Sequence, residues 1–273
     1  MKVTYALVTF ISLTSLLYRR VLSMNMNTLF SLQDKVVLVT GASGGLGSTI
    51  VDTMAAHGAK VIASDRTDQS IAKSGVVFIA CDLSRNEDID KLVEQAKTLY
   101  GRIDVFVSNA GVQGPAGPIE FITDDDWDLV MSINLKSALR LCSALIPDMA
   151  ERGQGSVILM SSIAGLRGNK TIGLYGLSKA GLAQLARNLA VEWGPKGVRV
   201  NAISPGLIRT PLATELLENE QFMQRRLLAT PLRRVGEPEE IAGVAVMLAS
   251  RAGGFISGQN IVVDGGTIIS DGN

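Results

Sequence analysis

The segment from Val36 to Gly47 reads VVLVTGASGGLG, an apolar run that leads directly into a glycine-rich loop. The apolar run predicts a strand that is buried on both faces of a parallel sheet. A stretch of helical character follows, from Leu46 to His57. Gly41, Gly45 and Gly47 would let the backbone approach a pyrophosphate, and the N–H groups of a helix N-terminus would favour its charge. The spacing differs from G-x-G-x-x-G, and a P-loop is excluded because no Gly-Lys-Ser/Thr follows.

Apolar runs recur along the rest of the chain and alternate with helical stretches. The predicted strands are residues 36–39, 61–63, 76–80, 105–107, 157–160, 198–203 and 260–263. Ser84-Arg85-Asn86-Glu87 reads as a capping box at the start of a helix, and the three acids after Thr123 suit another helix N-terminus. This alternation predicts an α/β fold: a single doubly wound Rossmann-type domain with a seven-stranded parallel sheet flanked by helices.

The composition is that of a folded protein with a neutral surface. Of the 273 residues 47% are hydrophobic, and 26 basic residues balance 26 acidic ones, which excludes disorder as the main state. Zero net charge and only 5% aromatic residues argue against a nucleic-acid partner. Cys81 and Cys142 have neither metal-ligand nor disulfide spacing. We therefore expect no metal site, and a reducing, cytoplasmic compartment.

The first 31 residues lie outside the strand and helix pattern. Residues 3–18 form an uncharged run between Lys2 and Arg19-Arg20; the run is short for a membrane span and no small-residue cleavage site follows it. Three interpretations stay open: a dispensable extension, a targeting segment, or an anchor that would bring the chain to a membrane. We expect residues 1–31 to be an extension and residues 32–273 to form the domain.

Acidic residues follow two of the predicted strands. Asp65 comes directly after the second strand, where a carboxylate can bind the ribose hydroxyls of an adenosine. Such a carboxylate would repel the 2′-phosphate of NADP, whereas the neighbouring Arg66 could bind that phosphate. Because Asp65 adjoins the strand end, we predict NAD as the cofactor, with NADP as the alternative. Asp82 follows the third strand and could bind an adenine amino group or cap the next helix.

Tyr175 and Lys179 lie four residues apart and therefore on one face of a predicted helix. A phenol with its ordinary pKa near 10 is a poor base at neutral pH. An ammonium beside it, together with a cationic nicotinamide, would lower the pKa of Tyr175. Ser162 closes the fifth strand, at the edge where open α/β sheets bind ligands, and its hydroxyl could hold a carbonyl oxygen.

Taken in this order, the motifs resemble those of the short-chain dehydrogenase/reductase family, from Leu32 to the C-terminus. The residues that carry the resemblance are Thr40–Gly47, Asp82, Asn109-Ala110-Gly111, Asn134, Ser162, Tyr175, Lys179, Pro205-Gly206, Thr210 and Val262–Gly266. The resemblance implies that Tyr175 is the general acid/base and that Lys179 binds the nicotinamide ribose. It further implies that Ser162, rather than Ser161, orients the substrate oxygen, and that Asn134 shapes its helix to hold a water in a proton relay.

The resemblance also implies a dinucleotide site that runs along the carboxyl ends of the strands. Residues 109–111 would support the sheet and the cofactor, and Thr210 would contact the carboxamide or phosphate side of the cofactor. The expected cofactor-binding residues are Gly41, Ser43, Gly45, Leu46, Gly47, Asp65, Asp82, Leu83, Asn109, Ala110, Gly111, Tyr175, Lys179, Pro205, Gly206, Ile208 and Thr210.

We therefore predict an NAD(P)-dependent oxidoreductase that interconverts a secondary alcohol and a ketone by hydride transfer. The alternative is a catalytically silent dinucleotide-binding subunit with a regulatory or structural role; the complete Ser162, Tyr175 and Lys179 set argues against it. The resemblance implies a homotetramer or a homodimer.

The expected substrate pocket is mixed in character, so a polyol, a small cyclic alcohol and a β-keto thioester all stay open as substrates. Its expected residues are Val112, Gln113, Gly114, residues 166–169, Ile172, Leu207 and a lid at residues 212–228. The arginine pairs at 225–226 and 233–234 are expected to be solvated rather than to form an anion site.

Overall fold

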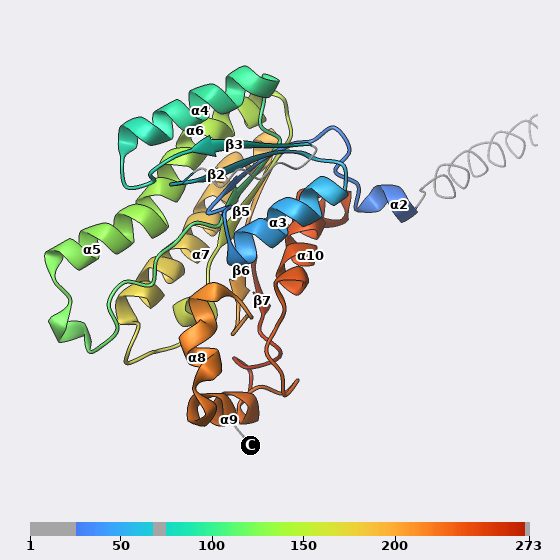
Figure 1. The fold of residues 1–273 in the computed structure, drawn as a ribbon. Helices are drawn as coiled ribbons and strands as arrows, with labels where there is room; N and C mark the ends of the chain where they lie inside the picture. Colours follow the sequence, from blue (N-terminus) through green and yellow to red (C-terminus); the bar gives the residue numbers. More distant parts are fainter. Residues whose placement is uncertain (1–25, 68–74, 271–273) are drawn as a thin grey trace, which may run out of the picture.

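Strand β1 (Val36–Thr40) is buried along its whole length, as its apolar sequence predicts. The structure is a computed structural model that describes residues 26–67 and 75–270; the uncharged run at residues 3–18 lies outside them. Within the described residues, seven parallel strands form one sheet in the order β3-β2-β1-β4-β5-β6-β7 (Figure 1). The other strands are β2 (Lys60–Asp65), β3 (Val76–Ala80), β4 (Val105–Ser108), β5 (Gly155–Met160), β6 (Val198–Pro205) and β7 (Asn260–Val263).

Helices connect these strands and cover both faces of the sheet. The described α-helices are α2 (Met26–Leu29), α3 (Gly45–Ala56), α4 (Asn86–Tyr100), α5 (Asp124–Met131), α6 (Ser137–Glu151), α7 (Gly173–Trp193), α8 (Thr214–Glu218), α9 (Glu220–Leu228) and α10 (Pro238–Ala249). Short 3₁₀ turns are η1 (Ile119–Phe121), η3 (Ile163–Gly165), η4 (Gly194–Lys196), η5 (Pro211–Ala213) and η6 (Arg251–Gly253), and η2 (Ser132–Lys136) is π-helical. The predicted doubly wound Rossmann-type fold is confirmed.

The core consists of two layers, because successive side chains of a strand point to opposite faces of the sheet. In β1, Val36 and Leu38 pack with α4, α6 and α7, whereas Val37 and Val39 pack with α3 and α10. Figure 1 shows α3 and α10 on the side of the sheet opposite α4 and α6. Burial on both faces explains why the strands read as continuous apolar runs rather than as alternating patterns.

The order of the strands reverses between β1 and β4, since the chain moves outward from β1 to β3 and then returns to pair β4 with β1. In open α/β sheets, ligands bind in the crevice outside the carboxyl ends of the strands at such a switch point. The glycine loop after β1 and residues 109–111 after β4 both lie there. The fold therefore places two of the predicted motifs side by side.

The capping box predicted at residues 84–87 is wrong. Helix α4 begins at Asn86, and its N-cap residue Arg85 makes no side-chain capping hydrogen bond. The Ser84 hydroxyl instead donates to Asp82 Oδ1 at 2.7 Å, and the Ser84 amide donates to the same oxygen at 2.9 Å. The Asp82 carboxylate thus binds the hydroxyl that the motif assigned to the helix. By contrast, Thr123 and Asp126 do form a capping box at the start of α5.

The continuous helical run Asp124–Glu151 is long and apolar enough to cross a membrane by length and composition alone. Its inward side chains, among them Leu141, Leu145 and Met149, are fully buried against the sheet and the neighbouring helices. Pairs of ions on its outer side, such as Arg140 with Asp90 on α4, hold it to its neighbour. These contacts identify the run as a core helix of the fold.

Candidate active site

A cavity of about 450 Å³ lies over the carboxyl ends of the strands. It extends from the ends of β2 and β3, across the glycine loop, to the start of α7 and the segment that follows β6. The described residues that line it include Gly41, Gly45, Leu46, Gly47, Asp65, Asp82, Leu83, Asn109, Ala110, Gly111, Ser162, Tyr175, Lys179, Pro205, Gly206, Ile208 and Thr210. Of the predicted site residues, Ser43 and Asn134 alone do not line it.

The glycine loop fits a pyrophosphate. A Cβ atom on Gly47 would overlap the carbonyl oxygen of Gly41, and one on Gly41 would lie 2.6 Å from Ala110 Cα. The N-cap residue of α3, Gly44, has no side chain, so the first N–H groups of this helix stay available to a ligand. Asn109 Nδ2 donates to the Gly41 carbonyl at 2.9 Å and thereby fixes the loop against β4.

The adenosine end of the cavity lies at the ends of β2 and β3. Asp65 is the last residue of β2 rather than the residue after it, and its Oδ2 accepts from the Ser43 amide at 3.0 Å. This bond ties β2 to the glycine loop and holds the carboxylate at the cavity wall. Arg66 lines the same wall. Hydrogen bonds from Ser84 hold the pKa of Asp82 below its ordinary value, so Asp82 is ionised at neutral pH.

Ser162 and Tyr175 meet at the other end of the cavity. Ser162 Oγ accepts from the Ala164 amide at 3.1 Å, so its hydroxyl hydrogen is directed away from this turn and toward Tyr175. The neighbouring Ser161 is different, because its hydroxyl is buried and donates to the Lys179 carbonyl at 2.7 Å. Of the two serines, Ser162 is therefore the one whose hydroxyl can reach a ligand.

Burial controls the titration of this group of residues. It raises the pKa of Tyr175 above its ordinary value, and a hydrogen bond with Ser162 opposes that rise. Burial also lowers the pKa of Lys179, to about 8. Desolvation of the phenol is the largest cause of the shift in the Tyr175 pKa. The lowering of the Tyr175 pKa by Lys179 together with a bound nicotinamide stays a prediction. Lys179 Nζ lies 5.5 Å from the Tyr175 ring centroid and donates to the Met160 carbonyl at 2.7 Å.

Asn134 lies in the π-helical turn η2, a kind of helix irregularity that is frequent at functional sites. Its Nδ2 donates to the Val112 carbonyl and to Ser178 Oγ, at 2.8 and 2.9 Å, and its Oδ1 accepts from the Val112 amide at 2.8 Å. Asn134 thus joins the loop after β4 to helix α7. Its side chain fixes the shape of the cavity wall rather than forming it.

Sequence reasoning misplaced part of the substrate pocket. Gly114, residues 166–169 and Ile172 do not line the cavity. Asn169 Oδ1 accepts from Thr171 and Ile172, which folds this loop on itself, and a bridge pairs Ile172 with Gly117. The lining residues that were not predicted are Gly44, Cys81, Ile133, Met160 and Ser161. Each is next in sequence to a predicted site residue or to another of these.

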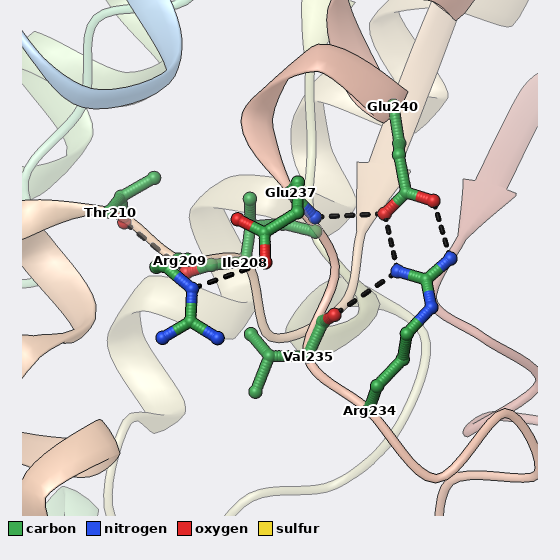
Figure 2. A network of polar contacts seen from close by, with 7 residues as sticks. All are labelled: Ile208, Arg209, Thr210, Arg234, Val235, Glu237 and Glu240. Atoms are coloured by element: carbon green, nitrogen blue, oxygen red, sulfur yellow. Dashed lines mark hydrogen bonds and ion pairs between the residues drawn. The ribbon is translucent and has the colours of Figure 1, made fainter.

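The segment after β6 closes the cavity opposite the glycine loop, where Thr210 Cβ lies 3.4 Å from a Cβ placed on Gly45. Figure 2 shows how this segment is held, by a group of contacts that we call the clasp. Arg209 Nε lies 3.1 Å from Glu237 Oε1, and Glu240 accepts from both terminal nitrogens of Arg234. The Glu237 amide donates to the same Glu240 carboxylate at 2.8 Å, and the Arg209 amide donates to the Gly236 carbonyl at 2.9 Å.

The clasp joins the two ends of a peripheral segment, residues 211–229, which contains η5, α8 and α9 and which we call the lid. Both ion pairs of the clasp are exposed to solvent, so their contribution is to geometry more than to stability. The hydrogen bonds from Arg234 lower the pKa of Glu240 to about 2, and the carboxylate therefore stays ionised through the physiological range.

Comparisons with known proteins agree with this arrangement. A family model described as enoyl-(acyl carrier protein) reductase matches residues 41–267. Dehydrogenase/reductase SDR family member 4 of Homo sapiens is 36% identical over 260 residues, which cover 91% of this chain and 92% of that protein. The chain belongs to the short-chain dehydrogenase/reductase family.

Solved structures of short-chain dehydrogenases have the same fold. A putative short-chain alcohol dehydrogenase from Sinorhizobium meliloti 1021 superimposes with a TM-score of 0.84 and 35% identity, over 89% of this chain and 99% of that one. A gluconate 5-dehydrogenase from Burkholderia cenocepacia J2315, solved with NADP and tartrate, has a TM-score of 0.86 and 27% identity, over 90% of this chain and 100% of that one.

Membership of the short-chain dehydrogenase/reductase family makes this chain an NAD(P)-dependent oxidoreductase of alcohols and ketones, as the sequence predicts. The relatives are named as dehydrogenases or reductases, and nothing among them supports a silent subunit. The glycine loop and the uncapped start of α3 are what a bound dinucleotide requires of its site.

Proposed function

We propose that Ser162, Tyr175 and Lys179 carry out the alcohol–ketone interconversion, with Asn134 as a positioning residue. The observation that supports these roles most directly is that the three side chains share one cavity with the glycine loop. NAD(P) bound along that cavity supplies a nicotinamide that accepts a hydride during alcohol oxidation or donates one during ketone reduction.

In the oxidative direction the Tyr175 phenolate takes the proton of the substrate hydroxyl as hydride leaves the carbinol carbon. Ser162, whose oxygen already accepts from Ala164, donates its hydrogen to the substrate oxygen and orients it. Lys179 uses one of its three N–H bonds on the Met160 carbonyl, so two others can donate to ribose hydroxyls. Gly111 leaves space for this lysine, because a Cβ there would lie 3.1 Å from Nζ.

A steady-state assay of secondary alcohols with NAD⁺ and NADP⁺, and of ketones with the reduced cofactors, tests this function. We expect alcohols to be oxidised only in the presence of an oxidised cofactor, and ketones to be reduced only in the presence of a reduced cofactor. Binding of a cofactor without turnover of any alcohol or ketone would contradict the proposed roles and would revive the silent subunit.

The pH dependence of ketone reduction follows from the directions of the two pKa shifts. Reduction needs a protonated phenol and a charged lysine; Tyr175, with its raised pKa, stays protonated well above neutral pH. Lys179 loses its proton near pH 8. We therefore expect kcat/KM for reduction to be constant below about pH 7 and to fall as the pH rises through about 8. A profile that stays flat to pH 10 would contradict the assignment of Lys179.

We also propose that NAD is preferred over NADP, although the Burkholderia relative was solved with NADP. The support is Asp65, which the Ser43 amide holds at the cavity wall. Like charges about 4 Å apart repel by roughly 4 kcal/mol at an effective dielectric of about 20, before screening. Asp65→Ser should therefore reduce the NAD preference, measured as the ratio of kcat/KM values, by about tenfold or more. If Arg66 binds the 2′-phosphate once Asp65 is replaced, the double variant with Arg66→Ala should lose the kcat/KM for NADP that the single variant gains. An unchanged ratio in the single variant would show that Asp65 does not face the ribose.

The remaining proposals concern assembly and location. We propose a homotetramer or homodimer, since Phe255 and Ile269 are exposed near β7, an edge strand of the sheet. Light scattering of the full chain measures the oligomeric state.

We propose a cytoplasmic protein, because Cys81 and Cys142 are free and buried. Residues 1–31 are proposed to be an extension to the domain 32–273. Cell fractionation of the full chain, with the protein in the soluble fraction, is the expected result, and a carbonate-resistant pellet would favour an anchor.

A further inference from the structure

The part of the cavity that lies over β4 to β6 and under the lid is lined almost entirely by apolar residues. They are Val112, Ile133, Leu207, Leu212, Ala213 and Leu216. The hydrogen bonds of Asn134 hold Val112 against the helix that carries Tyr175, and Leu207 follows the strand next to β5, at whose end Ser162 lies. Gln113 is the uncharged polar residue of this wall. These residues surround the space beside the reacting oxygen, which is where the rest of a substrate must lie.

The charged residues that line the cavity are either distant from this space or already engaged. Among the described lining residues they are Asp65, Arg66 and Asp82, at the ends of β2 and β3, and Lys179, which binds the Met160 carbonyl. The arginines of the lid region do not line the cavity. Arg209 and Arg234 belong to the clasp, and Arg233 donates to carbonyls at the end of α9. Arg225 donates to the Gln221 carbonyl. Arg226 is partly buried rather than solvated as the sequence suggested, and its Nε has no hydrogen-bond partner among the described residues, but it does not line the cavity. A carboxylate or phosphate on the substrate would find no cation among the described residues that line this part of the cavity, and burying an unpaired charge is strongly unfavourable.

The lid presents apolar surface to this space. Leu212 is 67% exposed and Leu216 is 40% exposed, although both line the cavity. The described residues of α8 and α9 include no buried one, so the leucines are not needed to pack the lid. An apolar group in the cavity would cover them and remove their surface from water. Leu228, at the end of α9, is 63% exposed and lies outside the cavity lining, which makes it a matched control.

Resting on the function proposed above, we propose that the substrate is an uncharged ketone or secondary alcohol with an apolar ring or chain next to the reacting carbon. Leu212 and Leu216 contact that ring or chain and determine specificity, and Gln113 binds at most one further neutral polar group. Sugar acids, sugar phosphates and polyols are poor substrates. In this respect the chain differs from the gluconate 5-dehydrogenase with which it shares a fold.

The experiment compares four ketones in the reductive direction with NADH and with NADPH. Acetophenone and cyclohexanone are the apolar probes, 5-ketogluconate is the anionic probe, and fructose is the polyhydroxylated neutral probe. We expect kcat/KM for the apolar ketones to exceed that for 5-ketogluconate and for fructose by at least about 100-fold. Equal or higher kcat/KM for either sugar probe would overturn this inference and leave the proposed function intact. Turnover of no probe by an enzyme that binds the cofactor would overturn both.

Variants of the lid test the two leucines directly. Leu216→Gln should raise KM for acetophenone by about tenfold with little change in kcat, whereas Leu228→Gln should leave both unchanged. Leu216→Arg should add the missing cation and raise kcat/KM for 5-ketogluconate relative to acetophenone. Because the leucines are exposed, the thermal unfolding temperatures of all three variants should match that of the parent chain. If Leu216→Arg left the ratio of kcat/KM for 5-ketogluconate to that for acetophenone unchanged, the lid would not determine which substrate is accepted.

Discussion

Tyr175→Phe is expected to lower kcat by about 100-fold or more while the protein stays folded and binds its cofactor. The substitution removes the one phenolic oxygen that can exchange a proton with the substrate hydroxyl. It keeps the ring that packs at the start of α7, and it leaves Lys179 bonded to the Met160 carbonyl. The cavity should therefore keep its shape and lose its acid/base group.

The measurement is kcat at saturating cofactor and substrate, with the dissociation constant of NAD⁺ determined by calorimetry. Tyr100→Phe supplies the control, because Tyr100 lies on α4, outside the cavity, and undergoes the same chemical change. Its kcat should equal that of the parent chain. Near-parental activity in Tyr175→Phe would remove this residue from the mechanism, and a loss of cofactor binding would show that the phenol acts in binding instead.

Gly47→Ala is expected to weaken cofactor binding by more than about tenfold. The added Cβ would overlap the Gly41 carbonyl oxygen and lie 2.7 Å from Asn109 Nδ2. Backbone at this loop must then move, and the bond from Asn109 to the Gly41 carbonyl moves with it. Displaced N–H groups can no longer meet a pyrophosphate at the N-terminus of α3.

Gly243→Ala is the matched control, since a Cβ at Gly243 meets nothing within 4 Å and Gly243 lies on α10, outside the cavity lining. We expect this variant to bind NAD⁺ as the parent chain does. Calorimetric dissociation constants and thermal unfolding curves for both variants separate lost binding from lost stability. If Gly47→Ala bound NAD⁺ normally, the inference that the backbone of this loop lies close to the pyrophosphate would be wrong.

The strands could be predicted because a strand buried on both faces is apolar at every position. Residues 36–39 and 105–107 illustrate this, because β1 and β4 are buried at every position, and the predicted bounds of these two strands differ from the observed ones by no more than a residue at either end. The start of α4 was not predictable in the same way. Its capping motif was present in the sequence, but the Ser84 hydroxyl donates to the Asp82 carboxylate, two residues upstream, and does not cap the helix.

The cavity residues that follow strands or open helices could be found from local sequence, since their positions depend on one element each. The environment of Asn134 depends on three elements: its own turn η2, the loop after β4 and helix α7. Its side-chain amide is hydrogen-bonded to Val112 in that loop and to Ser178 on α7, which are 22 and 44 residues away in the sequence. Spacing alone also cannot show burial. Tyr175 and Lys179 were correctly placed on one helix face, yet the direction of the Tyr175 pKa shift depends on how much water the fold removes from the phenol.

The lid leaves and rejoins the body of the protein at a single place. The bridge between Ile208 and Gly236 holds the two ends of residues 211–229 near one another, whatever lies between them. The entropy of closing a loop grows slowly with its length, so residues could be inserted or deleted in the lid at a small cost in folding free energy. Exposed loops of this kind tolerate such changes. Evolution could therefore alter which alcohols the enzyme accepts by rebuilding one peripheral loop, while Ser162, Tyr175 and Lys179 stay in place.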